Sequence, residues 1–129
     1  MILFLIAIGG AAGSLLRYII GGMVQRTSAS GFPVGTLFVN VAGCLLIGMF
    51  VRFLLNMQTS AELRALLVVG FCGGFTTFST FSFETVGLIE GGEYARAATY
   101  IVLSVLLCIT ATFTGMATVG AIAGTGHGR

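Results

Sequence analysis

An apolar segment in the middle of the chain contains Gly70-Phe-Cys-Gly-Gly-Phe-Thr-Thr-Phe-Ser-Thr-Phe-Ser-Phe-Glu84. In this segment the paired glycines Gly73 and Gly74 are followed by phenylalanines that alternate with hydroxyl side chains. Backbone at membrane depth leaves helical geometry only where protein or a polar cavity satisfies the freed hydrogen-bonding groups. The pattern therefore indicates a functional break in a membrane helix. The alternative is a flexible packing seam, because glycine is common in membrane helices.

Composition restricts the chain to a membrane protein. Of its 129 residues, 57% are hydrophobic and 8% are charged, and the mean hydropathy is +1.07. A soluble domain of this composition would expose a mostly apolar surface. One crossing needs about 20 residues, so the length suffices for four crossings and short connections. We therefore expect one all-α integral membrane domain over residues 1–129, with no room for a soluble enzyme module.

Local signals divide this domain into four helices. Pro33 suits a first helical turn, Ser60 is a good N-cap, and Gly91-Gly92 is typical of a helix end. Gly9 and Gly13 in the first span predict the close approach of another helix. The predicted spans are about 2–23, 34–55, 62–90 and 94–124, and the third is broken at 73–77.

Charge and cysteine usage exclude several classes of function. The net charge is +2, from six basic and four acidic side chains that are scattered along the chain. Nucleic-acid binding requires a concentrated basic face, so no nucleic-acid partner is expected. Cys44, Cys72 and Cys108 each lie in an apolar run, which favours packing over a disulfide or a metal site. No nucleophile–base pattern indicates an enzyme.

Three polar residues at membrane depth have two interpretations each. Arg17 either extends its head group to the interface or concentrates anions at a vestibule. Asn40 either forms an interhelical hydrogen bond or donates from its amide to a permeating solute. Glu84 either pairs with Arg17 or Arg64 or has a functional role, since an acidic group at that depth is costly.

The fourth span carries one polar face. Tyr100, Ser104 and Cys108 recur at every fourth residue, so they lie on one side of a helix. This face predicts a solute path or a contact with protein. The alternative is ordinary hydrogen bonding of a serine to a carbonyl of its own helix.

The arginines are nearly balanced between the two sides expected of a four-span chain. Arg52, Arg64 and Arg129 fall on one side, and Arg26 and Arg96 fall on the other, with Arg17 as a third if its head group extends that way. The positive-inside rule needs a bias, so this sequence permits insertion into the lipid bilayer in both orientations. Four short helices also enclose little beyond their own side chains. We expect a homodimer as the minimum assembly, and an antiparallel one is allowed.

A family resemblance rests on the central motif Gly73-Gly-Phe-Thr-Thr-Phe-Ser-Thr-Phe-Ser82, which closely resembles the signature of the CrcB/Fluc family of fluoride ion channels. The other pieces that agree in order and spacing are Gly13-Ser-Leu-Leu-Arg-Tyr18, Gly35-Thr-Leu-Phe-Val-Asn40 and the polar face of the fourth span. The resemblance implies an antiparallel, dual-topology homodimer in the bacterial inner membrane. Such a protein would export fluoride passively from the cytoplasm and lower its toxicity.

The resemblance also implies roles for individual residues. Phe78 and Phe81 would line the fluoride path with their ring edges, which carry positive quadrupole potential. Asn40 would donate its amide to the ion, and Arg17 would be the vestibule arginine. The polar part of the path would be Ser79, Thr80, Glu84, Tyr100, Ser104 and Cys108. At the last position the family more often has serine, and a thiol is the weaker donor.

A structural sodium ion at the dimer interface is a further implication of the resemblance. The main-chain carbonyls of Gly73 and Thr76 from both chains would hold it, and carbonyl oxygens are hard ligands suited to alkali cations. A negative charge on Glu84 beside an anion path requires that the group be protonated or be held by neighbouring hydroxyls. The sequence leaves both alternatives open.

Two other functions compete with the channel. A small dual-topology multidrug exporter has similar length and charge balance, but it needs an acidic residue early in its first span, where this chain has Arg17 instead. A non-transporting membrane subunit explains the glycines but not the break of hydroxyls and phenylalanines.

Overall fold

The structure, a computed structural model, describes residues 1–56 and 60–125. Its elements in chain order are α1 (Ile2–Gln25), α2 (Val34–Asn56), α3 (Ala61–Arg64), the π-helix η1 (Ala65–Cys72), α4 (Gly73–Phe75), α5 (Phe78–Glu90) and α6 (Tyr94–Thr125). Four helical runs are long and apolar enough to cross a membrane, namely Ile2–Gln25, Val34–Leu55, Ala61–Glu90 and Tyr94–Ile122. The prediction of an all-α membrane protein with a bent third span is confirmed.

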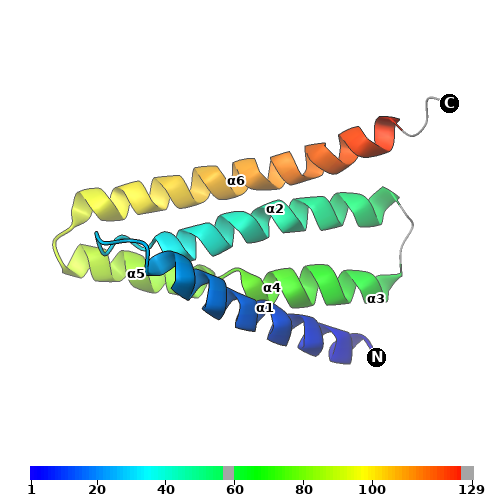
Figure 1. Ribbon diagram of the computed structural model, residues 1–129, viewed down its shortest axis with the longest axis horizontal. Helices are drawn as coiled ribbons and strands as arrows, with labels where there is room; N and C mark the ends of the chain where they lie inside the picture. The colour runs from blue at the N-terminus through cyan, green and yellow to red at the C-terminus, as the bar shows by residue number, and fades with distance from the viewer. Residues whose placement is uncertain (57–59, 126–129) are drawn as a thin grey trace.

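The four spans alternate in direction. Helices α2 and α6 run side by side and point the same way, while α1 crosses the third span (Figure 1). The N-terminus, the start of α3 and the end of α6 lie at one end of the molecule. The α1–α2 connection and the α5–α6 turn lie at the other end. Both ends of the described chain are therefore on one side, as four crossings require; Arg129, which was expected on that side, lies outside the described residues.

Glycines bring α1 against the third span. A Cβ atom at Gly9 would overlap the Leu66 carbonyl, and one at Gly13 would overlap the Phe71 carbonyl. Small residues let membrane helices approach closely, and the resulting dispersion contacts stabilise the pair where no hydrophobic driving force exists. The close approach predicted from these two glycines is confirmed, and its partner is η1.

The break in the third span is narrower than the predicted interruption at 73–77. Gly73 has helical backbone angles (φ −62°, ψ −35°), and α4 continues to Phe75. Only Thr76 (φ −89°, ψ 157°) and Thr77 (φ −151°, ψ 111°) are extended. The prediction was wrong at its glycine end because Gly74 serves packing: a Cβ atom there would overlap the carbonyl of Gly10.

The ends of the helices follow the predicted signals. The Ser60 hydroxyl accepts a hydrogen bond from the Leu63 amide (3.4 Å), so Ser60 is the N-cap of α3. After α5 the chain turns at Gly92, whose φ of 75° suits glycine, and the Glu93 amide donates to the Leu88 carbonyl (2.8 Å). A hydrogen bond from an amide to the carbonyl five residues earlier marks a Schellman C-cap. Both predicted boundaries are confirmed.

Two local features go beyond what the sequence indicates. The π-helix η1 replaces ordinary α-helix through the middle of the third span, just before the break. The first helix also extends to Gln25 instead of ending near 23. The Gln25 amide donates to the Phe32 carbonyl (3.0 Å) and accepts from the Gly35 amide (2.9 Å), so one side chain ties the end of α1 to the start of α2.

Candidate functional site

The break in the third span is held by Asn40. Its Nδ2 donates to the Thr77 carbonyl (3.0 Å), and its Oδ1 accepts from the Thr77 amide (2.7 Å). One side chain of α2 therefore satisfies both backbone groups of a buried residue that has left the helix. The amide forms the interhelical hydrogen bond that was one of its two interpretations. Because an amide group carries two donors, a second N–H is left for another acceptor.

A cluster of hydroxyls starts the helix that follows the break. The Thr77 hydroxyl accepts from the Thr80 amide (3.2 Å), so it caps α5. The same oxygen lies 3.1 Å from the Ser79 hydroxyl and 3.0 Å from the Thr80 hydroxyl. Two of the predicted polar residues, Ser79 and Thr80, are thus held together at a helix N-terminus, where the macrodipole favours negative charge.

The break also releases main-chain carbonyls, among them those of Gly73 and Thr76. In an uninterrupted helix, the Thr77 amide would donate to the carbonyl of Gly73 and the Thr80 amide to the carbonyl of Thr76. Here the first amide donates to Asn40 and the second donates to the Thr77 hydroxyl. The carbonyls of Gly73 and Thr76 therefore lose their usual donors. These are the two groups predicted as sodium ligands, and their chemistry fits a hard cation.

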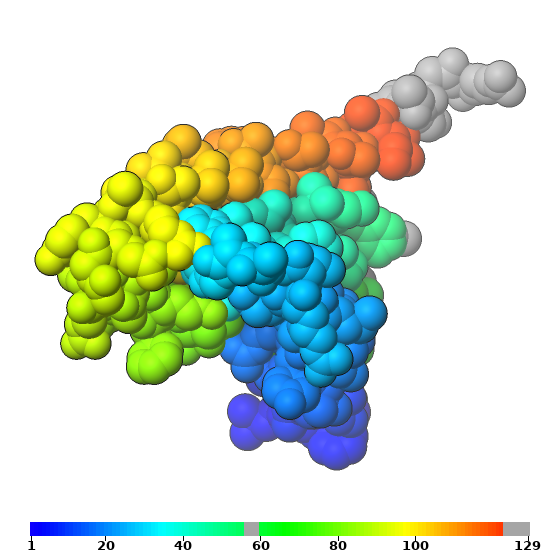
Figure 2. All heavy atoms as spheres, turned by 60° about the vertical axis from the view of Figure 1, so that its left-hand side comes forward, coloured from blue at the N-terminus to red at the C-terminus, as the bar shows by residue number. Residues whose placement is uncertain are grey.

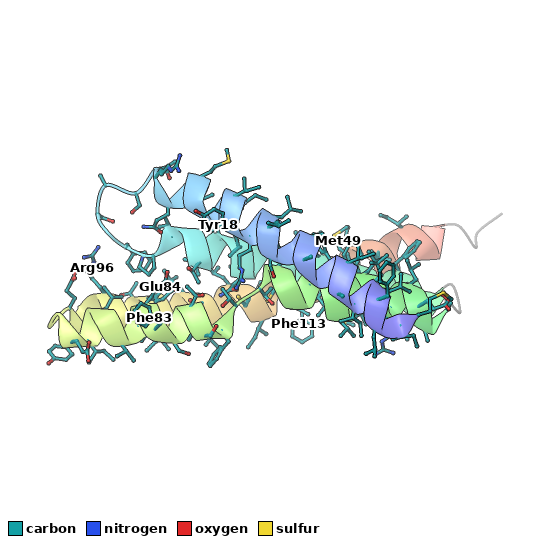
Figure 3. The ribbon with its side chains drawn as sticks, turned by 90° about the horizontal axis from the view of Figure 1, so that it is seen from below. Tyr18, Met49, Phe83, Glu84, Arg96 and Phe113 are labelled. Carbon is teal, nitrogen blue, oxygen red and sulfur yellow. The ribbon has the colours of Figure 1, made fainter. Side chains whose placement is uncertain are left out.

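Glu84 is held by hydroxyls from two other helices. Its carboxylate accepts from the Thr36 hydroxyl of α2 (2.8 Å) and from the Tyr100 hydroxyl of α6 (2.7 Å). Figure 3 shows Glu84 on the side of α5 that faces α2. The arginine partners considered from the sequence are not used, since the ion pair in the described part of the chain joins Glu93 to Arg96.

A groove of about 520 Å³ runs alongside the break. Its walls come from α2, the third span and α6, and they combine predicted site residues from all three. The predicted residues that line it are Asn40, Gly73, Thr76, Phe78, Phe81, Ser104 and Cys108. Most of the wall is apolar, so its few polar groups stand in a dry setting. There they interact more strongly than they would in water.

Ser104 is the polar group of this groove that stands out. It is buried, with 7% of its surface exposed, and its hydroxyl has no hydrogen-bond partner among the described residues. Other hydroxyls of α6 donate to their own helix, as Thr112 does to the Cys108 carbonyl (3.1 Å). The alternative of ordinary back-bonding is therefore not what Ser104 shows.

The aromatic residues of the groove differ in exposure. Phe81 is 9% exposed, with its ring centre 5.1 Å from that of Tyr100 and 5.3 Å from that of Phe78. Phe78 is 79% exposed and projects from the single chain. The edge of Phe81 is thus fixed by packing, whereas the surface of Phe78 is left free for another chain or for lipid.

A second hollow, of about 400 Å³, lies between α1 and α5 (Figure 2). It contains Arg17, Thr80 and Glu84 from the predicted set, and Thr77 borders both this hollow and the groove. The structure therefore divides the predicted site into two parts, one charged and one largely apolar. The Thr77 cluster lies between them. Tyr100, which is fully buried, reaches the charged part through Glu84.

A comparison with known families gives this arrangement a context. A family model described as CrcB-like protein, Camphor Resistance (CrcB), matches residues 4–116. The chain belongs to the CrcB family. The resemblance found in the sequence motifs is confirmed.

Curated relatives of this CrcB-family chain are similar over nearly their whole length. The fluoride-specific ion channel FluC of Rhizobium etli (strain CIAT 652) is 47% identical over 93% of this chain and 97% of its own. A protein of the same name from Thermus thermophilus is 48% identical over 93% and 96%. That of Geobacter metallireducens is 48% identical over 88% and 92%.

Two residues of the CrcB-family motifs were missed as parts of the site. Thr36 lies one turn before Asn40 in the same motif, and this spacing placed it on the same face of α2. Thr77 precedes Thr80 by three residues, the spacing of an N-cap and the amide it satisfies. Both signals were present in the sequence, but their partners Glu84 and Asn40 come from other spans.

Proposed function

We propose that the chain is a fluoride-selective channel of the bacterial inner membrane, through which fluoride leaves the cytoplasm passively and its toxicity falls. The observation that carries the proposal is the buried Ser104 hydroxyl, unpartnered within the described residues, in the groove that Asn40 and Phe81 also line. A buried donor without an acceptor costs about 1–3 kcal/mol. A small anion that accepts from this hydroxyl would offset that cost.

The donors of the groove suit fluoride in number and strength. Fluoride is small and strongly hydrated, so a pore must replace its water with several short-range donors. Ser104, the free N–H of Asn40 and the edge of Phe81 are such donors, and each is neutral. A ring of arginines would bind the anion too firmly, whereas conduction needs an ion that can also leave.

The charged hollow supplies an entry to this path. Arg17 raises the local concentration of anions there. The hydroxyls of Thr77, Ser79 and Thr80 then carry the ion between hollow and groove at the N-terminus of α5. Glu84 stays compatible with an anion because two hydroxyls already occupy its carboxylate.

A homodimer would complete the groove. In the single chain Phe78, which lines the groove, is 79% exposed. Phe83, on the same helix (Figure 3), is 80% exposed. A second copy in the opposite orientation would cover this surface and close the path from the lipid. Each chain would then have its own path, giving two per dimer.

The released carbonyls of Gly73 and Thr76 from the two chains would hold a sodium ion at the centre of this dimer. The residues present fit such an ion, since Asn40 and the Thr77 hydroxyl have taken the amides that would otherwise satisfy the two carbonyls. Bound there, sodium would supply positive charge that stabilises the interface and partly offsets the charge of a nearby anion.

A flux measurement on purified protein tests the proposal. We expect liposomes loaded with fluoride and containing the protein to release fluoride without a pH gradient, as followed with a fluoride-selective electrode. Liposomes loaded with chloride should retain it. The proposal fails if fluoride stays inside, or if chloride leaves at a similar rate.

The aromatic edge of the path is tested by Phe81→Ile. We expect fluoride release to fall at least about tenfold, because an aliphatic side chain fills the space but offers no positive edge. Phe113→Ile is the matched control, since Phe113 lies on α6 outside the groove and is 70% exposed (Figure 3). Equal release from both variants would contradict the role of Phe81.

A further inference from the structure

Three thiols line the groove that holds the proposed fluoride donors, and two of them come from neighbouring helices, α2 and α6. Cys44 comes from α2 and Cys108 from α6, and both are half-buried. We propose that this pair is a binding site for a soft, two-coordinate metal cation such as Hg(II), and that an ion bound there blocks the path. The blocking part of the inference rests on the proposed function, whereas the binding part does not.

The packing of α2 against α6 brings the two thiols together. The backbones of these helices touch at Gly48, where a Cβ atom would overlap the Thr112 carbonyl. Cys44 precedes Gly48 by one turn, and Cys108 precedes Thr112 by one turn. Because the two helices run in the same direction (Figure 1), both cysteines lie one turn before the Gly48–Thr112 contact and so at the same level along the helix pair. Both side chains line the same groove.

The coordination number follows from what surrounds the pair. Within residues 1–56 and 60–125, no group of three or more His, Cys, Asp or Glu side chains could hold a metal ion. A closed tetrahedral site for zinc is therefore not available there. Two sulfur ligands suffice for soft cations such as Hg(II), Ag(I) and Cu(I), which accept linear coordination by thiolates. The third thiol, Cys72, also lines the groove, but it comes from η1 and not from the α2–α6 contact, and it is buried with 1% exposure.

Binding exchanges protons for metal without any change of oxidation state. Two S–H bonds break, two S–Hg bonds form, and the two protons pass to water. This reaction changes the expectation that the cysteines serve packing alone. That expectation came from their apolar surroundings in sequence, whereas all three turn out to line one groove, two of them from adjacent helices.

A metal ion on this pair would obstruct the donors of the path. Asn40 lies one turn from Cys44 on α2, and Ser104 lies one turn from Cys108 on α6. All four side chains line the same groove. The bound cation and its two sulfur atoms would therefore occupy the space through which an anion reaches the Ser104 hydroxyl.

Titration with Hg(II) in the absence of added thiols tests both parts. Binding is read from the ultraviolet charge-transfer absorption of mercury thiolate on the purified protein, and block from fluoride release in liposomes. We expect one strongly bound ion per chain and loss of release at the same concentration. In Cys44→Ala and Cys108→Ser, the concentration for half-block, relative to each variant's own release, should rise at least about tenfold because chelation is lost.

Cys72→Ala is the matched control and should bind Hg(II) and be blocked as the original chain is. The site is wrongly assigned if either pair variant keeps full sensitivity, or if Cys72→Ala loses it equally. Block is refuted if the original chain binds one ion and still releases fluoride at its full rate. A protein that releases no fluoride at all refutes the proposed function, while the absorption titration still decides the site.

Discussion

At the scale of single residues, Asn40 shows how one side chain can stabilise a break in a membrane helix. Leaving the helix exposes the amide of Thr77 to an apolar interior, where an orphaned group is costly, while its carbonyl, at the N-cap of α5, can accept a second hydrogen bond. An asparagine amide has one acceptor and two donors, so it satisfies both groups at once. The donor that remains is the one available to a solute. The structural and functional interpretations of Asn40 are therefore compatible.

Asn40→Ala should destabilise the protein by about 1–3 kcal/mol, because it leaves the buried amide of Thr77 without a partner. Denaturation of the purified protein in mixed micelles with increasing SDS measures this change. Thr114→Ala is the control: that hydroxyl is exposed and bonds only to the Thr110 carbonyl of its own helix (2.8 Å). If both variants unfold at the same SDS fraction, Asn40 does not hold the break.

Thr36→Val tests how Glu84 is positioned. The substitution removes the hydroxyl that donates to one carboxylate oxygen (2.8 Å) and keeps the shape of the side chain. A hydrogen bond to a charged group contributes about 1.5–3 kcal/mol, so fluoride release should fall at least about tenfold as Glu84 leaves its position. Thr99→Val, which removes an exposed hydroxyl bonded to its own helix, should leave release unchanged. Equal rates in the two variants would show that the Thr36 contact is dispensable.

At the scale of helices, the sequence predicts what depends on local chemistry. Hydrophobic length gives four spans. Ser60 starts one helix and Gly92 ends another through groups within a few residues of themselves. The limits of the break were predicted less well, since Gly74 stays helical for the sake of a partner 64 residues away, Gly10. For Glu84 the sequence offered neighbouring hydroxyls as one alternative but did not identify both donors. Hydroxyls from two other spans hold it, and only the folded arrangement selects them over an arginine.

Alanine substitutions at two glycines distinguish the effect of helix packing on stability from that of helix propensity. Gly9→Ala should destabilise the fold by about 1–3 kcal/mol, since its Cβ would overlap backbone of η1 that cannot move aside as a side chain can. Gly87→Ala on α5 meets nothing within 4 Å and should be neutral or stabilising by up to about 1 kcal/mol. Thermal unfolding in detergent compares the two. A Gly9→Ala variant as stable as Gly87→Ala would mean that α1 does not pack on η1 as described.

At the scale of the whole molecule, the distribution of arginines leaves orientation undetermined. Arg26 and Arg96 lie at the end of the molecule that holds the α1–α2 connection. There Arg96, labelled in Figure 3, donates a hydrogen bond to the Ser30 carbonyl. Arg52 and Arg64 belong to the opposite end, near the α2–α3 connection. Insertion follows the side with more positive charge, so a balanced chain supplies both orientations from one sequence. An antiparallel dimer needs chains in both orientations.

Adding positive charge at one end of the molecule should therefore abolish fluoride release without disturbing the fold. Ala29→Lys combined with Glu90→Lys adds positive charge at the α1–α2 end, and Ala61→Lys combined with Glu62→Lys adds it at the other. Each double variant alone should insert in a single orientation and release little fluoride from cells or liposomes. Expressed together, the two should pair in opposite orientations and restore release.

Orientation itself is read with Gly91→Cys in a background of Cys44→Ala, Cys72→Ala and Cys108→Ser. An impermeant maleimide added outside intact cells should label roughly half of these chains, since neither side has enough excess charge to fix the topology. The fraction should fall toward zero with the first pair of lysines and rise toward completeness with the second. Full labelling or none in the balanced chain, together with activity of either biased variant alone, would rule out an antiparallel dimer.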